Sequence, residues 1–141
     1  MAKFKITKDD SKKAELYQTV VSEPMWMPLL CKIYQKAKAD DGSDLHKFQF
    51  TVMAVGNPDI DRYAGLTLFT QYSEKALGFM GPFLAAVGCE QDDEGNFELE
   101  DMKDLVEQKV DGYVIPDIYK QKSGSEKKQN RLEDFRPFSN W

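Results

Sequence analysis

The chain has 141 residues, 41% of them apolar and 12% aromatic, a composition typical of one globular domain rather than of a disordered segment. Its formal net charge is −5, and no apolar run approaches the roughly 20 residues that span a bilayer. Since residues 1–10 also lack the apolar stretch of a secretory signal, we expect a soluble cytosolic protein with no membrane partner.

The first part of the chain, residues 1–23, is polar and Lys-rich and predicts a flexible arm. Pro24 and Pro28 follow and favour an extended entry that carries Trp26. The expected organisation is an arm over 1–23, one domain over 24–138 and a short tail over 139–141.

Residues 29–39 alternate between two faces and predict the first strand. The face expected to enter the core carries Leu29, Cys31, Ile33 and Ala37. The face expected to point outward carries Leu30, Lys32, Tyr34, Lys36 and Lys38. This second set predicts a basic surface with an aromatic ring in its middle.

A turn at 40–43 (Asp-Asp-Gly-Ser) predicts a hairpin that leads into a second strand over 45–55. The inward side of this strand is expected to carry Phe48, Phe50, Val52 and Ala54, with His46 sharing their parity. Lys47 and Gln49 fall on its outward side.

A third strand is predicted over 66–72, with Phe69 on the face opposite Leu66 and Leu68. A helix follows over 74–87, because apolar residues recur there at helical spacing. Ser73 is expected to cap its start, and Gly88 is the expected residue just beyond its end.

The last part of the domain begins with an acidic insert, 90–98, and a short second helix predicted over 99–108. A fourth strand starts at 110, and Pro116 predicts that this part of it lies at an edge or a bulge. A basic loop over 122–129 and a fifth strand over 130–138 complete the domain. We expect Phe135 to complete that strand and Trp141 to pack on the domain.

The predicted order is three strands, one or two helices, and two further strands. We therefore predict an all-β protein with a five-stranded OB-like barrel and a helix between strands three and four, an architecture that commonly binds oligonucleotides. A mixed α+β sheet with the same element order is the main alternative.

No arrangement typical of an active site is found in the sequence. The single histidine, His46, follows a turn, and no nucleophile-elbow, zinc-protease, Walker A or dinucleotide-binding motif occurs. Cys31 and Cys89 are far apart and form no CxxC pair, so reduced thiols are expected rather than zinc or a disulfide. The acidic insert lacks the spacing of a calcium loop. We expect no enzyme activity, no cofactor and no metal.

The net charge conceals two basic segments. Residues 1–38 carry 8 basic against 4 acidic residues, and residues 119–136 carry 6 against 3, whereas residues 90–107 carry 1 against 9. Because salt screens charges beyond about 8–10 Å, a local surface can be positive on a negative protein.

Cations near aromatic rings on the predicted strands favour single-stranded nucleic acid, since cations contact phosphates and flat rings stack on bases. The expected phosphate contacts are Lys32, Lys36, Lys38, Lys47, Lys120, Lys122, Lys127, Lys128 and Arg131. The expected stacking residues are Tyr34, Phe69 and Tyr119, with Trp26 a further candidate. The competing interpretation is that these lysines only protect strand edges.

Several short motifs between residues 30 and 138 resemble a family of small phage proteins regarded as OB-fold single-stranded DNA-binding proteins. They are the segments Tyr63-Ala64-Gly65, Ser73-Glu74-Lys75-Ala76-Leu77, Phe83-Leu84-Ala85-Ala86-Val87-Gly88, Leu105-Val106, Lys109-Val110-Asp111-Gly112, Tyr119-Lys120 and Asn130-Arg131-Leu132-Glu133-Asp134-Phe135-Arg136-Pro137. The resemblance implies a role in phage replication or recombination in the host bacterial cytoplasm, with phage replication or recombination proteins as partners. The acidic insert and the Lys-rich arm depart from the family's pattern.

The sequence thus predicts a sequence-tolerant single-stranded DNA-binding protein, and a homo-oligomer is compatible with it. The alternative is an acidic interaction module or inhibitor that binds a phage or host protein, for which the acidic segment 90–107 and the aromatic end of the chain are the support.

Overall fold

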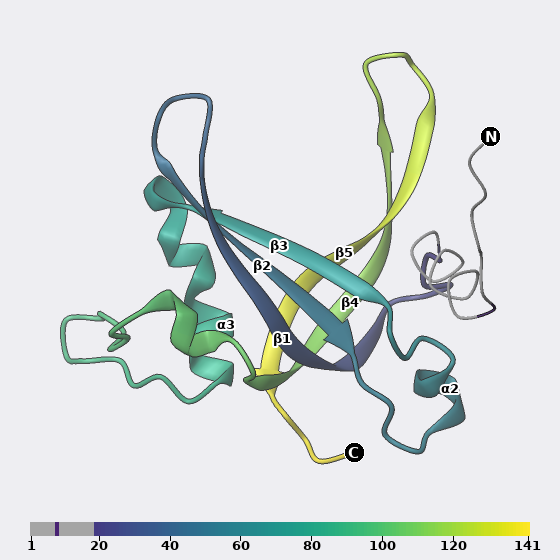
Figure 1. The fold of residues 1–141 in the computed structure, drawn as a ribbon, viewed down its shortest axis with the longest axis horizontal. Coiled ribbons are helices and arrows are strands. Elements are labelled where there is room, and N and C mark those ends of the chain that lie inside the picture. The colour runs from purple at the N-terminus through teal and green to yellow at the C-terminus, as the bar shows by residue number, and fades with distance from the viewer. Residues whose placement is uncertain (1–7, 9–18) are drawn as a thin grey trace, which may run out of the picture.

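The computed structural model describes residue 8 and residues 19–141, with the exception of the Tyr119 side chain, so most of the predicted arm lies outside the described residues. The elements are β1 (Met25–Lys38), β2 (Asp44–Val52), α2 (Pro58–Asp61), β3 (Thr67–Ser73), the 3₁₀ helix η1 (Glu74–Met80), α3 (Gly81–Ala86), the 3₁₀ helix η2 (Met102–Leu105), β4 (Lys109–Lys120) and β5 (Glu126–Pro137). Figure 1 shows the strands crossing at the centre and two hairpins rising from them.

The five strands form one antiparallel sheet in the order β3-β2-β1-β4-β5. β1 joins its two halves, since Met25–Leu30 pairs with β4 and Leu29–Lys38 pairs with β2. β3 and β5, the two outer strands, approach each other, but no ladder joins them among the described residues. The all-β class and the helical segment between β3 and β4 are confirmed.

A bulge in β1 changes which residues face the core. The pairing with β2 shifts between Cys31 and Ile33, so Lys32 is an extra residue in the strand. A bulge of this kind reverses the alternation beyond it. Tyr34 therefore shares the side of buried Phe48, its partner on β2, whereas Ile33 is 49% exposed. The prediction that Ile33 points inward and Tyr34 outward is wrong.

The core is built around Phe83 of α3, which is fully buried. Its ring lies 5.3 Å from the rings of Phe48 and Phe50 and 4.9 Å from that of Phe135, measured between centroids. Strand parity predicted the inward positions of Phe48 and Phe50 and the role of Phe135 correctly. Ala54 lies beyond the end of β2 and is exposed, contrary to the prediction.

The predicted helix over 74–87 is two shorter helices. η1 is a 3₁₀ helix with a non-helical residue inside it, and α3 begins at Gly81 with Pro82 in its first turn. Pro82 has no N–H to donate, which explains why a new helix starts there. The Ser73 side chain makes no capping hydrogen bond, so that prediction is wrong, while Gly88 has a φ of +86° as expected just beyond a helix end.

The predicted helix over 99–108 is shorter still, a single 3₁₀ turn from Met102 to Leu105. The predicted basic loop is also shorter than expected, because the β4–β5 ladder continues as far as the Lys120–Glu126 pair and takes up part of the predicted loop. Pro116 pairs only with β5, since the ladder to β1 ends at Val114, which agrees with the predicted edge position.

The end of the chain is fixed to a buried carboxylate. Asp111 is fully buried and accepts hydrogen bonds from Arg136 Nε at 2.9 Å, from Trp141 Nε1 at 2.8 Å and from the Ser139 hydroxyl. Trp141 thus packs on the domain, as predicted. No helix in the described part of the chain is long and apolar enough to cross a membrane.

Candidate nucleic-acid interface

An open groove of about 610 Å³ lies over the outward face of β1, β2 and β3. We call it the outer groove. The lining residues whose side chains are relevant to binding are Ile33, Gln35, Lys47, Gln49, Phe69, Gln71 and Gln129. Six of these seven come from the first three strands and Gln129 comes from β5. The two hairpins stand on either side of the crossing strands (Figure 1).

Strand register brings the groove residues together. Gln49 on β2 pairs with Ile33 on one side and with Phe69 on the other, so these three side chains form a row across the face. Lys47 likewise stands between Gln35 and Gln71. Ile33 and Phe69 are 49% and 59% exposed, so two apolar side chains stand in water on either side of the Gln49 amide, with further amides and one ammonium group beside them.

Of the predicted site residues, Lys47 and Phe69 line the outer groove. Sequence reasoning placed both on outward faces, and that is where they lie. The predicted list of site residues contains none of the four glutamines, although strand parity placed Gln49 on the outward side beside Lys47. Gln49 and Gln71 could have been found from strand parity, but Gln35 was concealed by the bulge and Gln129 by the prediction of a loop.

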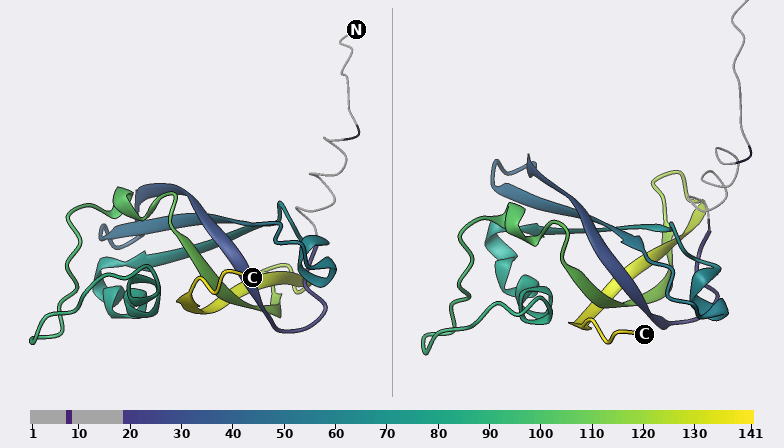
Figure 2. Two further views of the ribbon diagram at one scale, coloured as in Figure 1. Left: turned by 90° about the horizontal axis from the view of Figure 1, so that it is seen from below. Right: turned by 60° about the horizontal axis from the view of Figure 1, so that its bottom comes forward.

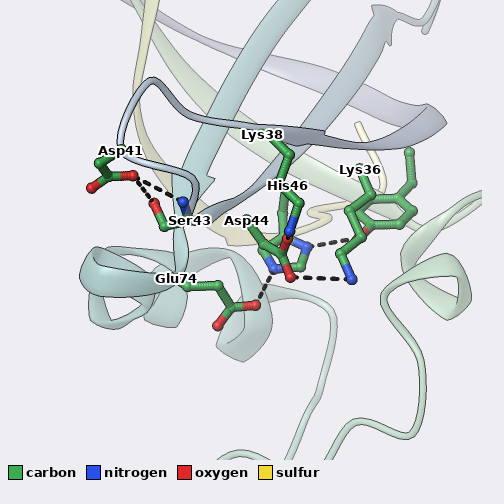
Figure 3. A network of polar contacts seen from close by, with 8 residues as sticks. Lys36, Lys38, Asp41, Ser43, Asp44, His46 and Glu74 are labelled. Carbon is green, nitrogen blue, oxygen red and sulfur yellow. Dashed lines mark hydrogen bonds and ion pairs between the residues drawn. The ribbon is translucent and has the colours of Figure 1, made fainter.

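The β1–β2 hairpin holds its cations in ion pairs. Lys36 Nζ lies 3.2 Å from one oxygen of Asp44, and Lys38 bonds the other oxygen (Figure 3). These bonds, with that of Lys38 the larger, lower the pKa of Asp44. Both lysines share the side of the strand that carries Tyr34 rather than Ile33, so they do not belong to the outer groove.

Tyr34 is held by His46 and does not face the outer groove. Its hydroxyl lies 2.7 Å from His46 Nδ1, and its ring is 5.8 Å from the His46 ring and 5.1 Å from the Phe48 ring. His46 is buried, and its Nε2 lies 2.7 Å from Glu74 Oε1 (Figure 3). Desolvation raises the pKa of the Tyr34 hydroxyl. Tyr34 and Phe69 therefore lie on opposite faces, contrary to the prediction that they share one.

The turn of the same hairpin is also tied down. Lys75 of η1 bonds the Asp41 carboxylate at 2.6 Å, and the Ser43 hydroxyl and amide donate to its other oxygen. These bonds, that of Lys75 foremost, lower the pKa of Asp41 to about 2. In the same hairpin, Lys36 and Lys38 share one carboxylate, so together they keep one net positive charge where the sequence predicted two.

The lysines of the β4–β5 hairpin have no ion-pair partner in the part of the chain that the structure describes. Within residues 19–141, no ion pair is formed by Lys120, Lys122, Lys127 or Lys128. Lys127 lies two residues from Gln129 and shares its side of β5, whereas Lys128 lies on the other side. Arg131, which shares the side of Gln129, is engaged by Glu133 at 2.9 Å and by Asp117 at 3.6 Å.

The remaining predicted residues lie elsewhere or are not described. Lys32 is the exposed extra residue of the bulge and does not line the groove. Trp26 carries the Arg136 guanidinium over its ring at 4.3 Å and also stands outside the groove. The backbone of Tyr119 pairs with Lys127, but its side chain lies outside the described residues.

The described cysteines and acidic residues make no metal site of three or more ligands. Cys31 and Cys89 are free thiols, and burial, together with nearby Glu107, raises the pKa of Cys31 to about 12. A scan against protein-family models finds no match to this chain, and a search of curated proteins finds none either.

Proposed function

We propose that this protein binds single-stranded DNA without strict sequence preference, through the outer groove and the β4–β5 hairpin. The observation that carries the proposal is the pair of exposed side chains Phe69 and Ile33, which flank Gln49 and lie among four amides and Lys47 on a face between two hairpins. Aromatic and apolar surface of this kind stacks on any base, since every base has a flat π-face.

The arrangement of the strands supports the proposal. In OB-fold barrels, the face of the second and third strands and the loops 1–2 and 4–5 bind oligonucleotides. Here the groove lies over the corresponding strands, the hairpins occupy the places of those loops, and a helical segment stands between β3 and β4. The approach of β3 to β5 fits a partly open barrel of this type. We therefore propose an OB-like barrel as the fold.

The distribution of charge favours one orientation of the strand. Among the residues that line the groove, Lys47 is the one cation, while the four lysines of the β4–β5 hairpin form no ion pair with any described residue. Bases would then lie against β2 and β3, and phosphates would face the β4–β5 hairpin. The glutamines can donate to or accept from any base edge, since each amide has both kinds of group.

A titration of a fluorescein-labelled oligo-dT strand, followed by anisotropy, tests the proposal. An oligomer of about 20 nucleotides exceeds the site size of one OB fold, about 4–16 nucleotides. We expect a dissociation constant below about 100 µM at about 50 mM salt, and weaker binding as the salt concentration rises. Absence of binding under these conditions would exclude the function.

Replacing Phe69→Ala should weaken binding by about 5- to 150-fold, the loss of one stacked base at about 1–3 kcal/mol. Phe79→Ala is the matched control, because Phe79 is 78% exposed on η1 and does not line the groove. Equal losses in both variants would show that exposed aromatic surface in general, rather than the groove, binds the oligomer.

The resemblance to phage single-stranded DNA-binding proteins extends the proposal to replication or recombination in an infected bacterial cytoplasm. An oligo-U competitor in the same titration distinguishes DNA from RNA as the preferred strand.

A further inference from the structure

A second groove, of about 460 Å³, opens where η1, α3 and the acidic segment meet. Met80 and Leu84 form its floor and belong to the core, while Leu77, Phe97, Leu99 and Met102 form its walls and are half-buried. We call it the acidic groove. It shares no lining residue with the outer groove, and its volume lies within the range of about 300–1,000 Å³ found for binding pockets.

The rim of the acidic groove is negatively charged. Glu100 and Asp101 line it, and the surrounding segment 90–107 carries 9 acidic residues and 1 basic residue. A phosphate backbone would be repelled by such a rim, so this groove does not extend the proposed DNA site. A ligand that fits this groove has apolar groups that contact its lining and positive charges that face its acidic rim.

The loop that forms the outer wall has a defined shape. Gln91 and Phe97 form an isolated antiparallel bridge, and the Asp92 carboxylate accepts hydrogen bonds from the amides of Glu94 and Asn96 at 2.9 and 2.8 Å. Figure 2 shows this segment leaving α3 and projecting beyond the sheet. The Phe97 ring thereby lines the groove and lies next to Gly81, the first residue of α3.

We infer that the acidic groove docks a basic amphipathic helix of a partner protein. Three apolar side chains spaced at i, i+3 or i+4, and i+7 are how such helices enter grooves of this kind. The seven-residue span covers about 10 Å along the helix, and lysines or arginines on its flanks would face Glu100 and Asp101. This inference does not depend on DNA binding, because the two grooves are separate.

The probe for this inference is a synthetic peptide of about 15 residues, close to the shortest length that forms a helix alone. It carries leucines at helical spacing and lysines on the other positions. A peptide of the same composition, scrambled so that no apolar stripe forms, is its control. We expect the amphipathic peptide to bind with a dissociation constant of about 10–100 µM at low salt, and to shift the amide NMR signals of Leu99 and Met102 on the full chain.

Charge reversal at the rim is the second arm of the test. Glu100→Lys should weaken the peptide about two- to fivefold, whereas Glu126→Lys, the same change on the β4–β5 hairpin, should leave its affinity unaltered. Leu99→Ser should abolish binding, with its thermal unfolding measured to verify that it folds.

Three results would overturn the inference. One is equal affinity for the amphipathic and scrambled peptides, which would mean that charge alone attracts them. Another is an equal effect of the Glu100→Lys and Glu126→Lys variants. The third is concentration-dependent self-association in sedimentation that Leu99→Ser removes, which would make a second copy of this chain the occupant.

Discussion

The two hairpins that flank the outer groove use their lysines in opposite ways. In the β1–β2 hairpin, Lys36 and Lys38 share the Asp44 carboxylate. In the β4–β5 hairpin, Lys127 and Lys128 form no ion pair within the described part of the chain. The comparison teaches that a count of lysines along a sequence does not measure the charge available to a phosphate. A lysine already paired with a carboxylate adds little to the local potential.

The largest expected difference concerns DNA affinity. Lys122→Gln together with Lys127→Gln should weaken oligo-dT binding about 10- to 50-fold at about 50 mM salt and reduce the slope of log K against log salt by about 1.4, because each lost phosphate contact contributes about 0.7.

The matched variant carries Lys36→Gln together with Lys38→Gln. The same two substitutions in the β1–β2 hairpin should weaken binding less, by about two- to fivefold, since those cations share the Asp44 carboxylate, which offsets one of their two charges. Anisotropy titrations at several salt concentrations measure both. A larger loss in the β1–β2 variant would mean that DNA crosses that hairpin instead.

A smaller effect separates the two faces of β1. Tyr34→Phe removes the hydroxyl that lies 2.7 Å from buried His46 Nδ1, so the free energy of unfolding should fall by about 1–2 kcal/mol. Its DNA affinity should stay the same. Ile33→Ala changes a residue that lines the outer groove, so it should weaken DNA binding and leave the free energy of unfolding nearly unchanged. Urea denaturation and anisotropy distinguish them, and equal affinity losses would mean that both faces contact DNA.

The smallest expected effect is the change in stability at low pH that comes from Asp41. The pKa of Asp41 in the folded protein, about 2, lies below the ordinary value of 3.8. Its contribution to stability is therefore complete above the unfolded pKa and is lost as the pH falls through about 2. Carboxyl NMR titration should find this low pKa in the wild type and a value nearer 3.8 in Lys75→Met. An ordinary pKa in the wild type would show that the Lys75 contact does not form in solution.

The sequence identified most strands and the inward residues of β2 because alternation survives wherever a strand pairs without interruption. Phe48, Phe50 and Phe69 lie where their parity predicted. Beyond Lys32 the same reasoning failed, since a bulge adds one residue without any glycine or turn residue to mark it. Tyr34 was therefore assigned to the wrong face.

The β4–β5 hairpin shows a second limit. Residues 122–129 have the composition of a loop, and only pairing with β4 makes a strand of Glu126–Gln129. That pairing is non-local, so local composition does not reveal it. For the same reason Gln129 did not appear among the expected site residues. The ion pair of Asp44 with two lysines likewise depends on register across the hairpin.

The Asp111 cluster also determines what the protein's own fluorescence can report. The chain has two tryptophans, and one lies beneath Arg136 while the other donates to Asp111. Since Arg136 itself bonds Asp111, both indoles are linked to one carboxylate, Trp141 directly and Trp26 through Arg136, and neither lines the outer groove. Intrinsic tryptophan emission should therefore report the unfolding of this cluster and should not change when a ligand binds in the outer groove. Binding there has to be followed by a label on the ligand.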